Sequence, residues 1–341
     1  MSSITLFGAG SWGTALSVHL ASAGRDVTLW ARRPEVVEKI RRTSYNPTYL
    51  PELLIPSTVT ITTDLEEAAR ASDFWGLAVP SQQLRERARA LRPHLHDDVT
   101  AVALSKGIEN DTLLTMTQVL ADVFDGVPRR QIGALYGPSH AEEVAEGRPT
   151  TVVAAAPDEI SAGHIQERSM TERLRVYINT DVIGVEIGGS AKNVLAIAAG
   201  ICDGVGYGDN AKAALVTRGL AEIQRLGRAL GANPQTFAGL AGVGDLVVTC
   251  MSRHSRNRHL GEQIASGKSW DDVVDDMEMV VEGVRTTRSV HDLAQRHSVE
   301  MPITEAVYSI LFDGKEPNEM VKRLMTRSAK PENWVPKSVE H

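Results

Sequence analysis

The sequence predicts an α/β domain with a doubly wound sheet, followed by an all-α domain. Three observations predict this organisation: the length of 341 residues, an alternation of short apolar runs with helix-patterned stretches up to residue 180, and long helical periodicities after residue 181. Domains usually run to about 100–200 residues, so two are expected. We place the domains at residues 1–180 and 181–341, and the short junction predicts that they pack over one cleft.

Seven apolar runs in the first part have the length and the Val, Ile and Leu content of strands. Strands alternating with polar, helix-patterned stretches are typical of βα units that wind a parallel sheet. Clear helix patterns lie at residues 13–23 and 80–91, the second between a Pro-Ser turn signal and Pro93. The expected strands are residues 3–7, 27–30, 74–79, 99–104, 132–136, 151–155 and 175–178.

The second part contains apolar residues at helical spacing over long segments, without strand-like runs between them. No internal repeat or low-complexity linker interrupts it. The expected helices are residues 187–201, 211–230, 257–266, 286–295 and 302–312.

Composition excludes several classes of protein. With 42% hydrophobic and 23% charged residues, the chain is able to bury a sizeable core and is neither disordered nor collagen-like. Its 36 basic residues against 43 acidic ones give a net charge of -7, which argues against a protein that coats nucleic acid or an anionic membrane. A local basic pocket remains compatible with this balance.

The two cysteines, Cys202 and Cys250, exclude a disulfide scaffold and a four-cysteine zinc site, and favour the cytoplasm. The ten histidines show no HExxH pattern and no metal-ligand spacing with either cysteine, so we predict no metal. No basic segment precedes a long apolar stretch at the N-terminus. The longest apolar run, residues 194–202, is shorter than the about 18 residues that span a bilayer, so we expect no membrane anchor.

The segment from Gly8 to Gly13 reads GxGxxG, directly after a predicted strand and directly before a predicted helix. The first glycine permits a tight turn, Gly10 lets a pyrophosphate approach the backbone, and the third allows helix and strand to pack closely. The free N–H groups at the start of the helix face the phosphates. A glycine-rich turn without a ligand is the alternative, but the context favours a Rossmann-like dinucleotide site.

The end of the second predicted strand indicates which dinucleotide binds. An NAD site usually has Asp or Glu about 20 residues after the glycines, to bind the ribose 2′-hydroxyl. Here Arg32 and Arg33 occupy that place. Guanidinium groups suit a 2′-phosphate, so we expect NADP(H), with NAD(H) as a further possibility. Alternatively, both arginines are solvated residues at the start of a helix that Pro34 opens.

Three lysines are candidates for chemistry. Lys106 follows a predicted strand, at the edge of the sheet where ligands collect. Lys192 begins the helical half among small apolar neighbours, where desolvation would lower its pKa toward a range useful for proton transfer. Lys212 lies in a similarly apolar helix. Spacing leaves all three open, because each is also compatible with an ordinary lysine whose stem covers apolar surface.

Polar residues near the glycine-rich stretch 239–244 are further candidates. Asp245 directly follows that stretch, and it is able either to bind a ligand or to cap a helix. Residues 252–259 concentrate basic and hydroxyl groups without interleaved aromatic residues, which favours a small anion pocket over a nucleic-acid surface. A solvated basic helix start fits them as well, and Glu282 is compatible with a surface turn.

Taken together, the motifs resemble the bacterial type of NAD(P)-dependent sn-glycerol-3-phosphate dehydrogenase. The resemblance covers essentially the whole chain, and several motifs are far more specific than GxGxxG. They are GAGSWGTAL from Gly8, ALSKGIE from Ala103, GPSHAEEV from Gly137, AKNVLAIAAGICDG from Ala191, AALVTRGL from Ala213, GLAGVGDLVVTC from Gly239, SRNR from Ser255 and VEGV from Val281.

The resemblance implies a 6-phosphogluconate dehydrogenase-like fold and the reversible reduction of dihydroxyacetone phosphate to sn-glycerol 3-phosphate for glycerophospholipid synthesis. Lys192 aligns with the family's proton acceptor, which gives the proton to the ketone oxygen in the reductive direction. Lys212 has no role in the pattern. The substrate-binding positions implied are Lys106, Gly137, Ser139, Lys192, Asp245, Ser255, Arg256 and Asn257. The cofactor-binding positions implied are Gly8, Gly10, Ser11, Trp12, Gly13, Arg32, Arg33, Lys106, Ala141, Arg256, Val280 and Glu282.

Two other functions are compatible with parts of this pattern. A β-hydroxyacid or imine reductase shares the two-domain organisation and a lysine on the first interdomain helix, but its substrate is a carboxylate. A non-catalytic NADP(H)-sensing protein could keep the same fold. The class suggests a homodimer, and we attach no function to the C-terminal tail, residues 329–341.

Overall fold

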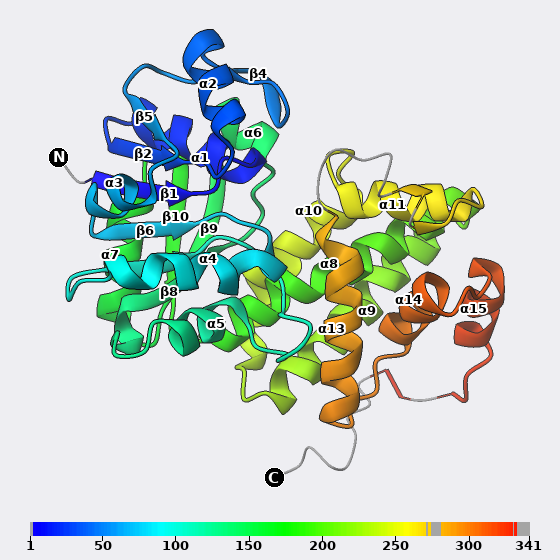
Figure 1. Cartoon of the computed structure of the whole chain (residues 1–341). Coiled ribbons are helices and arrows are strands. Elements are labelled where there is room, and N and C mark those ends of the chain that lie inside the picture. Colours follow the sequence, from blue (N-terminus) through cyan, green and yellow to red (C-terminus); the bar gives the residue numbers. More distant parts are fainter. Residues whose placement is uncertain (1–2, 271, 274–280, 330, 333–341) are drawn as a thin grey trace. The chain divides into compact units, whose positions relative to one another are not determined.

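The structure, a computed structural model of the whole chain, describes residues 3–270, 272–273, 281–329 and 331–332. The chain divides into two compact units, which Figure 1 colours along the sequence. Unit 1 comprises Met1–Glu109 and Leu114–Glu186, and unit 2 comprises Asn110–Leu113 and Ile187–His341.

Unit 1 contains an eight-stranded sheet in the order β10-β9-β8-β7-β6-β1-β2-β5. All seven predicted strands are confirmed, with ends within two residues of those expected. Because β1 lies between β2 and β6, the strand order reverses beside it, and ligands of such sheets bind at that point. The strands are β1 Ser3–Phe7, β2 Asp26–Trp30, β5 Val59–Thr62, β6 Phe74–Leu77, β7 Thr100–Ala103, β8 Ile132–Tyr136, β9 Thr150–Ala155 and β10 Leu174–Asn179.

The expectation of a wholly parallel sheet is wrong at one pair of strands. Strands β8 and β9 are antiparallel, with Tyr136 opposite Val153, and β10 runs parallel to β9. Periodicity cannot show this, because strand direction depends on whether the connection crosses the sheet. Here residues 137–149, with the short helix α6 (Ala141–Ala145), lead from the carboxyl end of β8 directly into its antiparallel neighbour. Gly137 and Ser139 therefore stay at the sheet edge where ligands collect.

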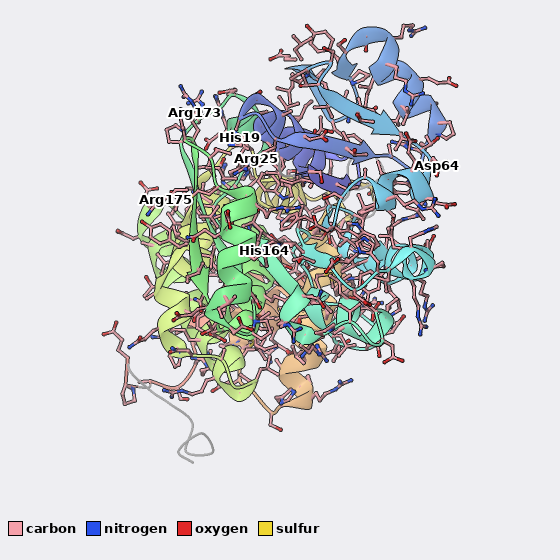
Figure 2. The ribbon with its side chains drawn as sticks, turned by 90° about the vertical axis from the view of Figure 1, so that its left-hand side faces the viewer. His19, Arg25, Asp64, His164, Arg173 and Arg175 are labelled. Atoms are coloured by element: carbon pink, nitrogen blue, oxygen red, sulfur yellow. The ribbon has the colours of Figure 1, made fainter. Side chains whose placement is uncertain are left out.

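The predicted helices of unit 1 are confirmed as α1 and α4, the latter preceded by a 3₁₀ turn at Ser81–Gln83. Polar caps fix several helix starts. Asp64 accepts hydrogen bonds from two backbone amides at the start of α3 (Figure 2), and Thr115 forms a capping box with Gln118 on α5. The helices are α1 Ser11–Ser22, α2 Pro34–Thr43, α3 Leu65–Arg70, α4 Leu84–Leu91, α5 Met116–Val123 and α7 Glu159–Ser169.

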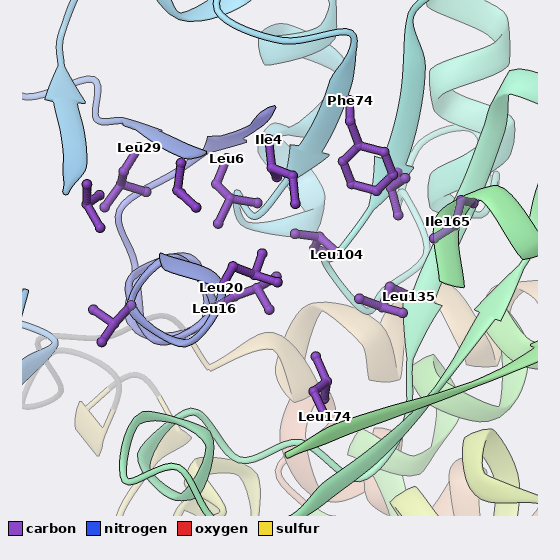
Figure 3. Packing of buried hydrophobic residues seen from close by; sticks show 14 of the residues in the cluster. Ile4, Leu6, Leu16, Leu20, Leu29, Phe74, Leu104, Leu135, Ile165 and Leu174 are labelled. Carbon is purple, nitrogen blue, oxygen red and sulfur yellow. The ribbon is translucent and has the colours of Figure 1, made fainter. Parts of the chain in front are cut away.

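One core cluster of unit 1 lies between the sheet and the helices α1 and α7 (Figure 3). Ile4 and Leu6 alternate along β1 so that both face the same side. There they join Leu16 and Leu20, one helical turn apart on α1. At the far end of α1, His19 Nε2 lies 2.7 Å from the Thr171 hydroxyl, on the side shown in Figure 2. The helix is thus fixed both by apolar packing and by a polar contact.

Strands β3 and β4 and strand β5 were not expected from the sequence. Strands β3 (Tyr45–Asn46) and β4 (Leu50–Leu54) form a separate two-stranded antiparallel sheet after α2. The stretch 47–56 contains three prolines, and proline is rare inside strands because it cannot donate a backbone hydrogen bond. Ser44, in the left-handed conformation with φ 61°, ends α2 and turns the chain into the hairpin.

Unit 2 is helical in its described residues, and the five predicted helices are confirmed, with α8 beginning earlier than expected. Helix α8 is long and apolar enough to cross a membrane, but 89% of the relevant window is buried, as in the core helix of a globular protein. Its first turn belongs to unit 1, where buried Glu186 accepts a 2.9 Å hydrogen bond from the Thr117 amide at the start of α5. The helices are α8 Val182–Val205, α9 Asp209–Ala229, α10 Asp245–Met251, α11 Arg256–Ala265, α13 Glu282–Arg296, α14 Pro302–Phe312 and α15 Pro317–Met325.

Candidate functional site

The glycine-rich turn of unit 1 requires glycine at its two ends. Gly8 has φ 121°, and a Cβ there would lie 2.4 Å from the carbonyl oxygen of Ala78, next to β6. A Cβ at Gly13 would lie 1.9 Å from the carbonyl oxygen of Gly8. Any side chain at either position would push β1, α1 and the turn apart.

Gly10 differs from its neighbours because a Cβ there would meet no atom within 4 Å. It is the N-cap of α1, and no side chain caps the helix start. The open backbone at Gly10 thus lies at a helix N-terminus, and such an N-terminus favours an anion such as a pyrophosphate. Ser11 is buried and Trp12 half-buried at the same helix start. These features fit a dinucleotide.

Arginines follow β2 where an NAD site usually has a carboxylate. Arg32 and Arg33 are both exposed, and Arg33 is also the N-cap residue of α2, so the structure leaves the alternative of a solvated helix start open. Arg33 Nη2 lies 3.4 Å from the Tyr49 hydroxyl. Arg87 of α4, which sequence reasoning missed, lies over the Trp30 ring with its guanidinium carbon 4.7 Å from the ring centroid. Burial lowers the pKa of Arg87, the Glu86 charge opposes this shift, and the Arg32 charge adds to it, so Arg87 and Arg32 lie close enough to interact at this end of β2.

Lys106, Gly137 and Ser139 lie together in unit 1, as the neighbouring strands β7 and β8 require. The ammonium of Lys106 donates a 2.7 Å hydrogen bond to the carbonyl oxygen of Gly137, and the Ser139 hydroxyl donates to the same oxygen at 3.0 Å. Gly137 has φ 142° and a close approach to β9. Ala141 begins α6 and packs against Ala15 of α1. Three residues from two sequence motifs thus form one polar cluster.

In unit 2, the ammonium of Lys192 forms a buried ion pair. Its Nζ lies 2.5 Å from Asp245 Oδ1 and 2.7 Å from the Thr249 hydroxyl. Lys192 is 6% exposed and Asp245 1% exposed. The sequence suggested only apolar neighbours for this lysine, which was incomplete. Asp245 is the first residue of α10 and does not cap it, so the capping alternative is wrong.

The glycine-rich stretch before α10 brings the carboxylate to the lysine. Leu240–Gly244 forms a π-helical turn that leads directly into α10. A Cβ at Gly188 of α8 would lie 2.5 Å from the carbonyl oxygen of Ala241, so only glycine lets this turn lie against α8. Thr249 follows Asp245 by four residues, which places both side chains on one face of α10. That spacing is the signal by which sequence reasoning could have found Thr249.

The start of α11 carries three of the predicted residues. Ser255 is the N-cap, and its hydroxyl oxygen accepts a 3.3 Å hydrogen bond from the Arg258 amide while keeping its own proton to donate. Arg256 is exposed. Asn257 is buried, donating to Asn193 Oδ1 at 3.0 Å and accepting from the Gly283 amide at 2.9 Å. Its amide therefore links α11 to α8, next to Lys192, and to the start of α13.

Lys212 and Glu282 lie on other helices of unit 2. Lys212 of α9 forms an ion pair with Asp203 of α8, and Asp203 also accepts a 2.7 Å hydrogen bond from Arg258 Nε. This pairing gives Lys212 a structural partner away from Lys192. Glu282 is the first residue of α13. Val280 lies outside the described residues, as does most of the tail from 329 to 341.

No metal chemistry is indicated by the part of the chain that the structure describes. No group of three or more His, Cys, Asp or Glu side chains that could hold a metal ion occurs among the residues searched there. Both cysteines are buried, and burial raises the pKa of Cys250 to about 12, so its thiol is not a nucleophile at neutral pH.

Comparison with known proteins identifies the family. The sequence patterns of the N-terminus and the C-terminus of NAD-dependent glycerol-3-phosphate dehydrogenase match residues 3–162 and 181–322. A glycerol-3-phosphate dehydrogenase [NAD(P)+] from Salinibacter ruber is 80% identical over 340 residues, covering all of both chains. One from Chlorobium phaeobacteroides is 51% identical, over 96% of this chain and 98% of its own.

A solved structure agrees with the sequence comparison. The crystal structure of glycerol-3-phosphate dehydrogenase from Coxiella burnetii superimposes with a TM-score of 0.91 at 37% identity, covering 96% of this chain and 99% of that one. The fold expected from the sequence, an α/β dinucleotide-type domain followed by a helical one, is thus confirmed. By sequence over both halves and by structure, the chain belongs to the NAD-dependent glycerol-3-phosphate dehydrogenase family.

Proposed function

We propose that the chain reduces dihydroxyacetone phosphate reversibly to sn-glycerol 3-phosphate, with Lys192 as the proton donor. One observation carries the assignment of the donor: a buried ammonium held between Asp245 and Thr249. A ketone oxygen gains negative charge as its carbon receives a hydride, and a buried ammonium is suited both to stabilise that charge and to give up a proton. The reaction is assigned from the family, and Lys192 is assigned as the acid from its buried ammonium.

The glycine-rich turn and the arginines after β2 support binding of a nicotinamide dinucleotide by residues 1–180. When bound, NAD(P)H supplies the hydride. The amides at the start of α1 bind the pyrophosphate, and Arg32 and Arg33 bind the 2′-phosphate of NADP(H). The cofactor-binding set is Gly8, Gly10, Ser11, Trp12, Gly13, Arg32, Arg33, Lys106, Ala141, Arg256, Val280 and Glu282.

The substrate carries a phosphate and hydroxyl groups, and charged and polar groups in both units suit them. In unit 2, the exposed guanidinium of Arg256 stands at the start of α11, where the helix N-terminus also favours an anion. In unit 1, Lys106 and Ser139 offer an ammonium and a hydroxyl. The substrate-binding set is Lys106, Gly137, Ser139, Lys192, Asp245, Ser255, Arg256 and Asn257.

The proton step is local to Lys192. As the carbonyl carbon takes the hydride, the ammonium gives its proton to the carbonyl oxygen, and the ketone becomes a secondary alcohol. Lys192 is left as a neutral amine and recovers a proton from water. Asp245 keeps the ammonium in place before the transfer, and Thr249 fixes its direction. In the oxidative direction the same amine accepts the proton.

The wider setting follows from the family and the composition. We place the enzyme in the cytoplasm as a homodimer that provides glycerol 3-phosphate for glycerophospholipids, with residues 181–341 as the substrate and catalytic domain. Analytical ultracentrifugation of the purified chain measures the oligomeric state, and a monomer at micromolar concentration would contradict the dimer.

The assignment of Lys192 is tested by following NADPH oxidation with dihydroxyacetone phosphate. Lys192→Ala should lower kcat by about 10²- to 10⁴-fold and leave NADPH affinity nearly unchanged. Lys212→Ala is the matched control, because it removes another ion-paired lysine of unit 2 and should leave kcat within about twofold. Near wild-type turnover by Lys192→Ala would exclude the assignment. Turnover of small 2-keto or 3-keto acids instead of dihydroxyacetone phosphate would favour a hydroxyacid reductase. Turnover of neither kind of substrate would favour a non-catalytic NADP(H)-sensing protein.

A further inference from the structure

The hairpin of β3 and β4 has no role in the proposed chemistry, yet it contacts the glycine-rich turn. Asn46, at the end of β3, is 1% exposed. Its side-chain amide donates a 3.0 Å hydrogen bond to the carbonyl oxygen of Ala9 and a 2.9 Å hydrogen bond to the hydroxyl of Thr14. Ala9 lies between Gly8 and Gly10 in the turn, and Thr14 lies in the first turn of α1. One buried side chain thus connects the turn to the helix that follows it.

Apolar packing holds the hairpin in the same place. Leu50 of β4 is buried in a cluster with Ala15 of α1, and Leu53 and Trp12 pack against that cluster. The ends of the hairpin are joined by a 2.8 Å hydrogen bond from the Ile55 amide to the Ser44 carbonyl oxygen. The hairpin therefore has contacts that hold Asn46 in place besides its hydrogen bonds to Ala9 and Thr14.

The geometry of the peptide bond makes this contact significant. The carbonyl oxygen of Ala9 and the N–H of Gly10 belong to one planar trans peptide and point in opposite directions. A donor that holds the oxygen of Ala9 on one side therefore aims the N–H of Gly10 to the other side. The helix does not use that N–H, because Gly10 is its N-cap. Donation to the oxygen also polarises the peptide and strengthens its N–H as a donor.

We propose that Asn46 is a positioning residue for coenzyme binding, fixing the Ala9–Gly10 peptide so that the Gly10 N–H faces the pyrophosphate. This inference rests on the proposed function of the glycine-rich turn. Asn46 does not touch the coenzyme in this account and acts through the backbone. Because NADPH and NADH share the pyrophosphate, both should depend on Asn46 equally.

The test measures dissociation constants of NADPH and NADH by fluorescence titration of the purified enzyme, together with steady-state kinetics. Asn46→Ala should weaken both coenzymes by about tenfold, the effect of one buried hydrogen bond on the turn. Asn46→Asp has the same shape but cannot donate when ionised, so it should bind both coenzymes no better than Asn46→Ala. At saturating NADPH, kcat should stay within about twofold, because the chemistry depends on other groups.

Two controls separate the possible failures. Ser72→Ala removes a buried side chain that donates a 2.6 Å hydrogen bond to the Ser3 carbonyl oxygen, at the other end of β1. It should lower the melting temperature without changing coenzyme affinity. Gly10→Ala places a methyl group where the pyrophosphate is proposed to lie and should weaken both coenzymes.

The outcomes are distinct. If Gly10→Ala keeps full affinity, the proposed role of the turn is wrong. If Gly10→Ala weakens binding but Asn46→Ala does not, only the role of Asn46 is wrong. The role of Asn46 is also wrong if Asn46→Ala lowers the affinity for NADPH alone. The same holds if Ser72→Ala lowers coenzyme affinity as much as Asn46→Ala does, at the same drop in melting temperature. If neither Asn46 variant folds, Thr14→Val and Thr14→Ser test the proposal instead, because Asn46 donates to the Thr14 hydroxyl as well. Thr14→Val should lower the affinity for both coenzymes, and Thr14→Ser, which keeps the hydroxyl, should not.

Discussion

The candidate site of unit 1 consists mainly of backbone groups, whereas the candidate site of unit 2 consists of side chains. In unit 1 the glycine-rich turn offers backbone amides, and its shape depends on the absence of side chains at Gly8 and Gly13. In unit 2 the site is a network of side chains, in which Lys192 pairs with Asp245 and Thr249 inside a helical core. The first site is formed by adjacent residues, whereas the second joins residues 53 and 57 positions apart.

This difference predicts different sensitivities to substitution. A site made of backbone is damaged by adding atoms, because added atoms move strands and helices. A site made of side chains is damaged by removing atoms, because the partners of a buried charge are then left unpaired.

The largest expected effect comes from adding one methyl group to the turn. Gly13→Ala would place a Cβ 1.9 Å from the Gly8 carbonyl oxygen, so α1 must move away from the end of β1. Overpacking of this kind costs about 3 kcal/mol, and coenzyme affinity should fall with it. Thermal unfolding and NADPH titration measure the two effects.

The matched substitution three residues earlier sharpens the comparison. Gly10→Ala meets no atom within 4 Å, and its backbone conformation suits alanine, so stability should change by less than about 1 kcal/mol. Only coenzyme affinity should fall. Equal losses of stability in both variants would show that the turn is not shaped by the Gly13 contact.

Unit 2 also has a buried carboxyl group outside the candidate site, and its protonation should make stability depend on pH. Glu222 of α9 is 1% exposed and accepts hydrogen bonds from the amides of Ile303, at 2.7 Å, and Thr304, at 3.1 Å, at the start of α14. Burial outweighs these hydrogen bonds and the nearby Arg225 charge, and raises the pKa of Glu222 from 4.5 to about 7.

The direction of the pH effect follows from that shift. The folded state binds the Glu222 proton more tightly than the unfolded chain, so the contribution to stability is complete below pH 4.5 and is lost as the pH rises to about 7. The loss is about 3 kcal/mol. Glu222→Gln removes the titration but keeps only one of the two acceptor oxygens, so it should be less stable overall, and its free energy of unfolding should vary less between pH 5 and pH 7. An unchanged pH slope in chemical denaturation would contradict the assignment.

The contrast between the sites also explains what the sequence alone could reveal. The turn was readable because its glycines are adjacent and their spacing follows from one local geometry. Spacing could not rank Lys106, Lys192 and Lys212, because the partner of each lysine lies on another strand or helix. Resemblance to the family ranked them. Thr249 was missed, although it follows Asp245 by one helical turn.

The fold shows the same limit. Alternation of apolar residues located the central strands, because each is buried and bounded by turns. It could not give the antiparallel direction of β9, which depends on the path of residues 137–149. The strands β3 and β4 were not predicted, and the prolines of this hairpin are compatible with an edge strand as well as with a loop. Asn46, within it, has no motif of its own and is recognised only by its contact with Ala9.

A smaller effect is expected where unit 1 uses exposed side chains instead of backbone. Arg32 and Arg33 are open to solvent, so each charge contributes about 1 kcal/mol to binding a 2′-phosphate. Arg32→Ala combined with Arg33→Ala should therefore weaken NADPH by about 30-fold and leave NADH nearly unchanged, since NADH has a hydroxyl there. The difference should shrink at high salt, because exposed charges are screened. Equal losses for both coenzymes would show that these arginines are a solvated helix start, and that the backbone alone makes the coenzyme site.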